Sequence, residues 1–592
     1  MLSRFNIFLV QNPVSIWLRN KLNPRQFVLF SAFIVGQIAG LAAVALKFFV
    51  HFIETKTELI SANYRYIVAT LPFIGISLCS LYVIYLNRNK LGRGLANILH
   101  AIARKSSYLP SDQVYSHIIS SGITVGFGGS SGLESPIVTT GSAIGSNVGR
   151  VLRLTYKERT LLLACGAAAG IAGAFNTPIA GVLFALEVLL VEANISAFVP
   201  LLIASAAGAL SSKMILHEDI LLHFSLREPF NYNNTIFYTL LGVICGFASV
   251  YYSKAFLLTE NWFKKINSTL AKVVLAGVGL FCLILLFPPL FGEGYHSIKT
   301  LAGESPLQIM QNSLLGKGIT LPFFLISILF IIILKPFATG MTLGGGGNGG
   351  NFAPSLFSGA LLGYLFSESI SLTGVIKLPV ANFTLVAMAG LLSGVFHAPL
   401  TGIFLIAEIT GGYELIIPLM IVSAISYGVA RYFMPLSIDY KKLAEKEQIV
   451  ATDTDSYLLS NIRLKGFLET DFSEVGYDST LREMVNIVST SRRNIFPVLD
   501  REGHLKGLIT IDDIREIMFK QELYDVIKVK DLVHPATIIL TEKDDIQTAM
   551  KVFDQTHLWN IPVVYGGLYK GFISKSTILE RYRASLINSS VG

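Results

Sequence analysis

The sequence predicts a multi-spanning α-helical membrane protein with internal repeats and broken helices, followed by a small C-terminal α/β domain. Its 592 residues are 52% hydrophobic and only 15% charged, whereas a soluble domain usually carries about 25% charged residues. Motifs rich in Gly and Pro also recur in the same order before Tyr440. The first observation predicts a membrane protein, and the second predicts a duplicated unit.

Long apolar runs mark the expected membrane spans. A helix needs about 20 mostly apolar residues to cross the hydrocarbon core of a bilayer. Five runs approach this length, namely Val28–Val50, Ile67–Leu86, Ile236–Tyr252, Val273–Phe287 and Ile319–Leu334. So many apolar runs in series exclude an ordinary soluble protein.

The segment 1–27 precedes the first run and carries positive charge. It contains Arg4, Arg19, Lys21 and Arg25 and no acidic residue. An excess of Lys and Arg beside a span predicts a cytoplasmic segment, so we assign the net charge of +8 to membrane orientation and expect no nucleic-acid partner. The segment shows no secretory signal peptide.

Three motifs of the first half are echoed in the second half at offsets of about 200 to 220 residues. Gly92-Arg-Gly returns as Gly292-Glu-Gly. The second motif, Gly132–Pro136, returns as Gly350–Pro354, and the third, Gly173–Pro178, returns as Gly394–Pro399. Duplicated units with Gly- and Pro-broken apolar segments are typical of transporters, and their corresponding breaks point to the binding site.

After the repeats, a charged stretch from Lys441 to Gln448 predicts a linker, and two related shorter units follow. Asn494–Val498 leads to Gly507–Ile514, and Asn560–Val563 leads to Gly571–Ile578. Each unit reads as a strand, a turn, a second strand and a capped helix start. The pair resembles tandem CBS domains, the βαββα modules that pack as one body.

The break at Gly350–Pro354 predicts an anion site made of backbone amides. A helix N-terminus offers unpaired N–H groups and about half a positive charge. The glycines before Asn351 allow close approach of the backbone, and Pro354 suits a first helical turn. No side chain of this break is charged, which favours an anion that binds and leaves again.

The matching break in the first half carries one acid, Glu134. A carboxylate is attracted to a helix N-terminus as a bound anion is. It can therefore occupy an anion site and vacate that site when it is protonated. Ionisable residues within membrane segments are usually functional, so we predict Glu134 as a gate.

These motifs resemble those of the CLC family of chloride channels and H+/Cl− exchangers. Gly132–Pro136 is similar to its G-K/R-E-G-P motif, Gly350–Pro354 to its G-x-F-x-P motif, and Gly181–Glu187 to the helix that follows the first motif. The resemblance implies inverted repeats of broken helices, a homodimer and one pore per subunit. It assigns gating to Glu134 and anion binding to Gly132, Leu133, Gly350, Asn351 and Phe352.

The chain departs from the family pattern at two further candidate anion-binding positions. Arg93 stands where the family has a serine that contacts the central anion. Asp439 stands at the position of a pore-lining tyrosine, which places Tyr440 one residue late. We retain Arg93 and Tyr440 as candidates, with a displaced or ion-paired Arg93 as the alternative.

A third departure concerns proton coupling. Many exchangers of the family carry two consecutive glutamates where this chain reads Glu187-Val188, and valine cannot carry a proton. This difference favours channel-like conduction of chloride or a similar anion, and proton-coupled exchange is the alternative. Glu187 and Glu192 are the candidates for a proton path. A CBS-bearing cation transporter is a remote alternative, because the breaks supply amide donors rather than the oxygen ligands that magnesium needs.

The C-terminal pair raises the question of a nucleotide ligand. In nucleotide-binding CBS pairs a Ser or Thr followed three residues later by Asp holds the ribose. Thr510 and Asp513 keep this pattern, whereas Ser574 is followed by Thr577. We expect at most one adenine-nucleotide site, with a purely structural domain as the alternative. No other cofactor, no metal and no enzymatic activity are expected, since no nucleophile–base pair or metal-ligand spacing stands out.

The expected domain order follows from these assignments. It is a cytoplasmic segment 1–27, a transmembrane domain 28–440 with repeats over about 28–215 and 235–440, a linker 441–467, and CBS domains at 468–522 and 528–585. We expect a multi-pass protein in the lipid bilayer with both termini in the cytoplasm.

Overall fold

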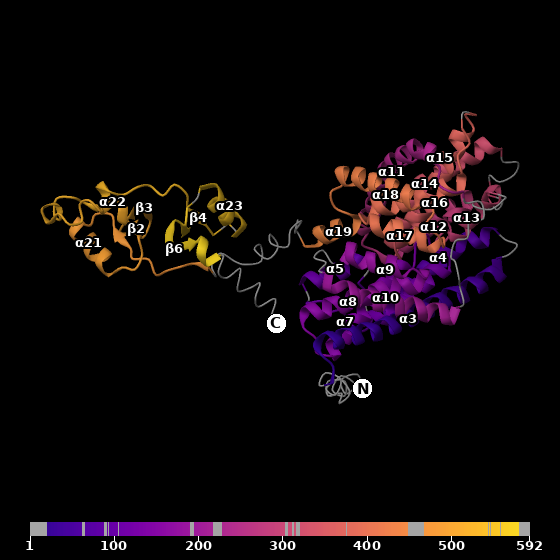
Figure 1. Cartoon of the computed structure of the whole chain (residues 1–592), viewed down its shortest axis with the longest axis horizontal. Helices are drawn as coiled ribbons and strands as arrows, with labels where there is room; N and C mark the ends of the chain where they lie inside the picture. Colours follow the sequence, from indigo (N-terminus) through magenta and orange to yellow (C-terminus); the bar gives the residue numbers. More distant parts are fainter. Residues whose placement is uncertain are drawn as a thin grey trace. The chain divides into compact units, whose positions relative to one another are not determined.

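The computed structural model describes residues 21–578 except 62–64, 88–90, 93, 105, 190–194, 217–227, 302–305, 311–312, 315–319, 375, 448–466, 543, 545 and 557. The chain divides into two compact units, one ending at Gln448 and the other beginning at Ile449 (Figure 1). The first unit is helical, and the second combines helices with two small sheets.

The first half of the helical unit runs from α3 to α10. Its elements are α3 (Pro24–Ser61), α4 (Arg65–Leu81), the π-helical turn η1 (Tyr82–Leu86), α5 (Leu95–Arg104), α6 (Gln113–Gly126), α7 (Glu134–Val151), α8 (Tyr156–Phe175), α9 (Pro178–Phe184), the π-helical turn η2 (Ala185–Leu189) and α10 (Ile195–Leu216).

The second half repeats this order. It comprises η3 (Tyr232–Asn234), α11 (Thr235–Lys264), α12 (Thr269–Leu286), η4 (Pro288–Leu290), α13 (Tyr295–Leu301), η5 (Pro306–Met310), α14 (Leu321–Gly344), α15 (Phe352–Ser371), α16 (Val380–Phe396), α17 (Pro399–Ile409) and α18 (Ile416–Phe433), and then α19 (Ile438–Glu447). The last helix extends past residue 440, so the first part of the segment expected as a linker belongs to this unit.

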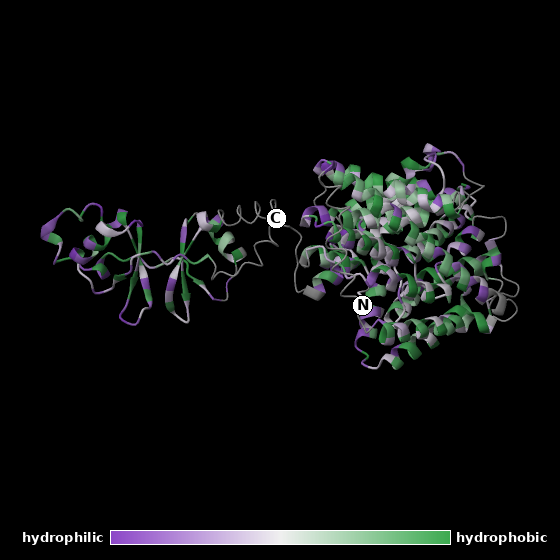
Figure 2. Cartoon of the chain, turned by 90° about the horizontal axis from the view of Figure 1, so that it is seen from below, coloured by the Kyte–Doolittle hydropathy of each residue, from purple (hydrophilic) through white to green (hydrophobic). Residues whose placement is uncertain are grey.

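Eight helices of the described residues are long and apolar enough to cross a membrane. Three of the five predicted runs lie wholly within such helices, and Val273–Phe287 and Ile319–Leu334 overlap two others, Thr269–Leu286 and Leu321–Gly344. The two longest of these helices are Pro24–Thr57 and Tyr232–Lys264. Large apolar side chains such as Phe52 on α3 and Leu258 on α11 are exposed, and hydrophobic residues dominate this unit (Figure 2). An apolar surface of this kind suits contact with lipid.

The α7 and α8 helices pack closely because small residues line their contact. A Cβ atom on Gly141 would lie 2.0 Å from the Gly166 carbonyl oxygen of α8, so only glycine fits there. Close backbone approach at small residues is the usual mode of helix packing in membranes. The α15 and α16 helices form the corresponding contact in the second half, where a Cβ atom on Gly363 would lie 2.2 Å from the Phe383 carbonyl oxygen.

The ends of α8 and α16 show the repeat in their backbone. Each helix ends on a left-handed residue, Asn176 or His397. Pro178 or Pro399 then begins the next helix. A left-handed residue closes the helix end, and proline suits the first turn of the next one. His397 therefore has a structural role in the backbone.

The C-terminal unit contains two similar βαββ modules. The first has β1 (Val475–Gly476), α21 (Leu481–Thr490), β2 (Ile495–Leu499), β3 (Leu505–Thr510) and α22 (Ile511–Ile514), and the 3-10 turns η7 (Gln521–Leu523) and η8 (Val529–Asp531) follow. The second has β4 (Leu540–Thr541), α23 (Ile546–Thr556), β5 (Asn560–Tyr565) and β6 (Leu568–Ser574).

Each module forms a three-stranded sheet whose first strand pairs parallel with the second and whose second pairs antiparallel with the third. The segment before each module also pairs with a strand of the other module. Glu469 pairs with Phe572 of β6, and His534 pairs with Leu508 of β3. The two predicted modules therefore fold as one body.

Candidate functional site

The two Gly-rich breaks lie against each other in the helical unit. The N–H of Gly132 donates to the carbonyl of Gly350 at 2.9 Å, and the N–H of Gly350 donates back at 2.8 Å. This antiparallel bridge places the first turns of α7 and α15 beside one another. Segments more than 200 residues apart in the sequence thus build one site, as a duplicated transporter unit predicts.

A reciprocal pair of threonines fixes the two breaks. The hydroxyl of Thr342, at the end of α14, accepts the N–H of Ser130 at 3.1 Å. The hydroxyl of Thr124, on α6, accepts the N–H of Asn348 at 3.0 Å. Each loop is therefore held by the half of the protein to which it does not belong.

Glu134 is the first residue of α7 and is only 2% exposed. Its Oε1 atom accepts a hydrogen bond from the Tyr295 hydroxyl at 2.9 Å. Its Oε2 atom lies beside Gly132 and Ala353, the second residue of α15, and has no hydrogen-bond partner among the described residues. The backbone N–H groups of Glu134 itself and of Ala353 also act on this carboxylate, so it lies between the start of its own helix and the start of α15.

A cavity of about 120 Å³ opens beside Glu134. Asn351 and Phe352 line it at the start of α15, where backbone N–H groups have no partner within the helix. The Asn351 side chain does not cap the helix, and its Oδ1 accepts the Tyr252 hydroxyl at 3.4 Å. These amides are therefore free to face a ligand in the cavity.

Aromatic rings and charged side chains complete the cavity wall. The ring of Phe352 lies 5.4 Å from that of Phe396 and 6.3 Å from that of Phe184. The other lining residues are Gly94, Leu95, Ser135, Val138, Glu260, Leu343, Asn348, Gly349, Gly350, Asp439 and Lys442.

The charged group in this wall was not predicted. Lys442 of α19 pairs with Glu260 of α11 at 2.6 Å, and its ammonium lies 4.6 Å from the Phe256 ring centre. Asp439 of α19 accepts a hydrogen bond from the N–H of Ala96 in the first turn of α5. The sequence showed Asp439 only as a displaced tyrosine position.

Two predicted anion-binding residues have other contacts. The N–H of Leu133 donates to the Glu293 carboxylate at 2.8 Å, so this amide is already taken by the protein. The hydroxyl of Tyr440 donates to the Val188 carbonyl at 3.4 Å, and Tyr440 is not among the residues that line the cavity. Arg93 lies outside the described residues.

The Glu187 side chain caps a helix of the other half. Its carboxylate accepts the N–H groups of Leu400 and Thr401 at 3.0 and 2.8 Å, at the start of α17. Glu408 reciprocates by accepting the N–H groups of Ile179 and Ala180 at the start of α9. These hydrogen bonds hold the Glu187 carboxylate in a helix cap, and its role in a proton path stays a prediction. Val188 is buried, and Glu192 lies outside the described residues.

In the C-terminal unit the candidate ribose-binding residues make internal hydrogen bonds. Asp513 accepts the N–H and the hydroxyl of Thr510 at 2.7 and 2.8 Å, as a capping box. The hydroxyls of Ser574 and Thr577 both donate to the Glu469 carboxylate. The second position is therefore occupied by an acid of the protein itself.

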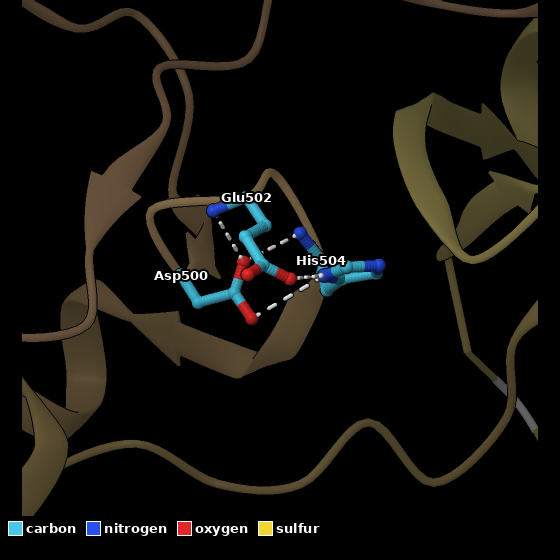
Figure 3. Close-up of side chains that lie close together, drawn as sticks. All are labelled: Asp500, Glu502 and His504. Atoms are coloured by element: carbon cyan, nitrogen blue, oxygen red, sulfur yellow. Dashed lines mark hydrogen bonds and ion pairs between the residues drawn. The ribbon is translucent and has the colours of Figure 1, made fainter.

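The turn between β2 and β3 gathers Asp500, Glu502 and His504 (Figure 3). Asp500 Oδ1 accepts the N–H groups of Glu502 and His504 at 3.0 and 2.9 Å. Its Oδ2 lies 3.1 Å from the Lys506 ammonium. These hydrogen bonds, the one from His504 first, lower the pKa of Asp500 to about 2. The cluster stabilises a turn, and the Lys506 ammonium already supplies the positive charge beside it.

Comparison with known proteins identifies the membrane unit. The family model described as "Voltage gated chloride channel" matches residues 75–431, and the CBS domain model matches residues 466–520. The chain belongs to the voltage-gated chloride channel (CLC) family. The predicted family resemblance and the predicted CBS resemblance are both confirmed.

Relatives and solved structures agree with this assignment. The H(+)/Cl(−) exchange transporter ClcA of Klebsiella pneumoniae is 30% identical over 412 residues, which cover 67% of this chain and 83% of that protein. A slow cyanobacterial Cl−/H+ antiporter matches with a TM-score of 0.62 and 22% identity, over 72% of this chain and 99% of the other. A eukaryotic CLC transporter matches with a TM-score of 0.60 and 18% identity, over 93% and 97%. The inverted-repeat membrane fold with broken helices is therefore confirmed.

Two residues near Glu134, Glu293 and Tyr295, escaped the sequence analysis. Both follow Gly292 in a motif that served only to establish the repeat. The useful signal was the acid itself, because Glu293 replaces Arg93 of the first-half motif within an apolar region. An ionisable residue at such a place is a functional candidate by default.

Proposed function

We propose that the protein moves chloride or a similar small anion across a membrane through the cavity beside Glu134. The observation that carries this proposal is the meeting of two long helix N-termini, α7 and α15, around a cavity lined by backbone amides. Helix N-termini attract anions through their unpaired N–H groups and the helix dipole. Membership of the CLC family supports the same function.

Glu134 acts as the gate in this proposal. Its carboxylate lies by the start of α15, where a transported anion would bind. Protonation removes its charge and with it the attraction to the helix end. Among the side chains that the structure describes, only the Tyr295 hydroxyl donates a hydrogen bond to Glu134, so the neutral side chain can swing away and leave the position to the anion.

Anion efflux from proteoliposomes tests the gate. Flux through the wild-type protein should rise as the pH falls on the side that reaches Glu134. Glu134→Gln, which mimics the protonated acid, should give flux that is largely independent of pH. Glu368→Gln makes the same change in the last turns of α15 and serves as the matched control. A folded Glu134→Gln protein that keeps the wild-type pH dependence would contradict the assignment of Glu134 as the gate.

For coupling, we propose channel-like conduction. Val188 stands at the inner proton-carrying position of the family, and the adjacent Glu187 is held in a helix cap. Proton-coupled exchange is the second candidate, and a specific observation favours it. Asp439 and Glu260 bring two carboxylates into the wall of the anion cavity, and carboxylates can carry protons. ClcA, the relative described above, is an exchanger by name.

A pH trace recorded during chloride flux separates the two candidates. Channel-like conduction predicts little uphill proton movement when a chloride gradient is applied to vesicles. Robust proton pumping would instead establish exchange. Asp439→Asn and Glu260→Gln would then be compared. Substitution of the more important proton carrier should abolish pumping while anion flux persists.

We also propose a homodimer with one anion pathway per chain and with both termini in the cytoplasm. The family resemblance supports the dimer, and the positive segment 1–27 supports the orientation. Mass measurement in detergent tests the first statement, since a monomeric mass would contradict it. Labelling of cysteines introduced at either terminus, from outside intact cells, tests the second, because labelling would contradict it.

A further inference from the structure

The gate described above does not use a second acid that lies close to it. Glu293 sits between Gly292 and Gly294, in the loop that leads to α13. This loop is fixed by a hydrogen bond from the Gly292 N–H to the Gly128 carbonyl at 2.9 Å. The Glu293 carboxylate accepts the Leu133 N–H at 2.8 Å. It therefore occupies the N-terminus of α7, immediately before Glu134.

The two carboxylates thus lie at two different helix ends. Glu293 is at the start of α7, and Glu134 is at the start of α15. Glu134 is almost fully buried, with one oxygen unpartnered among the described residues. Glu293 is only half-buried, so this residue is more accessible to solvent than Glu134. The hydroxyl of Tyr295, two residues after Glu293, donates a hydrogen bond to Glu134.

A buried lysine completes the cluster. Lys335 of α14 is fully buried, and its ammonium donates to the Gly292 carbonyl at 3.0 Å. The ammonium also lies 4.7 Å from the centre of the Phe357 ring. The charged groups that act on Glu293 are Lys335, Glu134 and, from α3, Glu54.

The acids of this cluster outnumber its single ammonium, so a bound proton lowers the excess of negative charge. Glu134 and Glu293 bring two carboxylates and Lys335 one ammonium into this cluster, Glu54 adds a further acid, and an uncompensated buried charge is costly. Two carboxylates in one site share a proton because both cannot remain ionised. One proton on the pair lowers its charge from −2 to −1, which reduces the excess of negative charge beside Lys335.

We propose that Glu293 is a proton-binding site that shares one proton with Glu134 and supplies it to the gate. This inference rests on the proposed gating role of Glu134. In the closed state Glu293 carries the proton, and Glu134 is the carboxylate at α15. The proton leaves the Glu293 carboxyl group and adds to the Glu134 carboxylate. The pair keeps its charge of −1, the neutral Glu134 leaves α15, and ionised Glu293 remains at the start of α7.

The pH dependence of anion efflux from proteoliposomes tests this role. Glu293→Gln keeps an oxygen that accepts the Leu133 N–H but removes the proton store and the neighbouring negative charge. Acid activation should shift to lower pH, by about one unit or more, as expected for strongly interacting sites. Lys335→Met removes the cation and should shift activation to higher pH. The control Glu368→Gln should shift it in neither direction.

The outcomes separate this inference from the gate itself. If Glu134→Gln is pH-independent while a folded Glu293→Gln keeps the wild-type midpoint, the gate stands and the shared proton is wrong. If Glu134→Gln keeps the wild-type pH dependence, the gate is wrong as well. The double variant should match Glu134→Gln alone, because Glu293 acts only through Glu134. Midpoint shifts in the same direction for Glu293→Gln and Lys335→Met would indicate general disturbance of the loop and overturn the proposal.

Discussion

A methyl group at Gly132 should open the gate without any change to Glu134. The Cβ atom of Gly132→Ala would lie 2.0 Å from Glu134 Oε2 and 2.9 Å from the Ala353 Cβ. Gly132 does not have a positive φ, so its backbone accepts alanine. The atom that must move most is the far end of a flexible side chain. The carboxylate is therefore expected to leave the start of α15.

The size of the effect follows from what holds Glu134 in place. Attraction to a helix end is worth about 0.3–2 kcal/mol, and a hydrogen bond to a charged group such as that from Tyr295 is worth about 1.5–3 kcal/mol. We take the displaced carboxylate to lose about 2 kcal/mol of this stabilisation. Since about 1.4 kcal/mol corresponds to a tenfold change, flux at neutral pH should rise by about thirtyfold.

Gly350→Ala is the matched control, because it adds the same methyl group on the other side of the glycine bridge. Its Cβ would lie 2.6 Å from the Ser135 Cβ and 3.2 Å from the Ser135 backbone nitrogen. These atoms belong to the first turn of α7 and cannot yield without moving the helix. We expect this variant to lose thermal stability and flux instead of gaining flux.

Anion efflux at neutral and acidic pH, with matched amounts of folded protein, decides the outcome. Gly132→Ala should approach the pH-independent flux of Glu134→Gln. If it keeps both the low flux at neutral pH and the acid activation of the wild-type protein, then the carboxylate position beside Gly132 is not the closed position of the gate. The steric reasoning would then be refuted.

Three further predictions follow from the other contacts. Asn351→Pro removes a backbone N–H and should weaken chloride binding in calorimetry by about tenfold or more, whereas Asn351→Ala should matter less, and equal losses would contradict coordination by the backbone. Calorimetry with an adenine nucleotide should find at most one site per chain, at Asp513, because an internal acid already engages Ser574, and two equivalent sites would contradict this. The pKa of Asp500 is lowered to about 2, mainly by the hydrogen bond from the His504 N–H, so the stabilisation that ionised Asp500 gives the C-terminal unit should be complete above about pH 4 and lost as the pH falls through about 2. Thermal unfolding of Asp500→Asn should lack this loss of stability at low pH, and a variant with the wild-type pH profile would contradict the prediction.

The membrane helices and their breaks could be predicted because their signals are local. A run such as Val28–Val50 predicts a span by length and composition alone, and α3 contains it. Gly132–Pro136 and Gly350–Pro354 lie at helix starts because glycine and proline impose backbone conformations that do not depend on distant residues. The order of the repeats then predicts which breaks meet.

The role of Glu187 could not be predicted in this way. Its partners, Leu400 and Thr401, lie more than 200 residues away in sequence, and only the two-fold relation of the halves brings them together. The repeat did contain the information, because Glu408 stands at the position in the second half that corresponds to Glu187. Two acids in equivalent places of the repeat therefore predict the exchanged helix caps.

Three helix starts near the cavity each hold an acid of the protein, and their attachments explain why we propose one of them, Glu134, as the gate. Asp439 accepts the Ala96 N–H at the start of α5, and Glu293 accepts the Leu133 N–H at the start of α7. Glu134 lies by α15 with one oxygen unpartnered among the described residues and the other held by the Tyr295 hydroxyl. Releasing Asp439 or Glu293 would leave a backbone donor unsatisfied in the protein, which is costly. Releasing Glu134 breaks the hydrogen bond from Tyr295 and the contacts of its carboxylate with the backbone of Glu134 and Ala353, and the arriving anion then satisfies the exposed helix end, so the exchange of carboxylate for anion is close to balanced at this position.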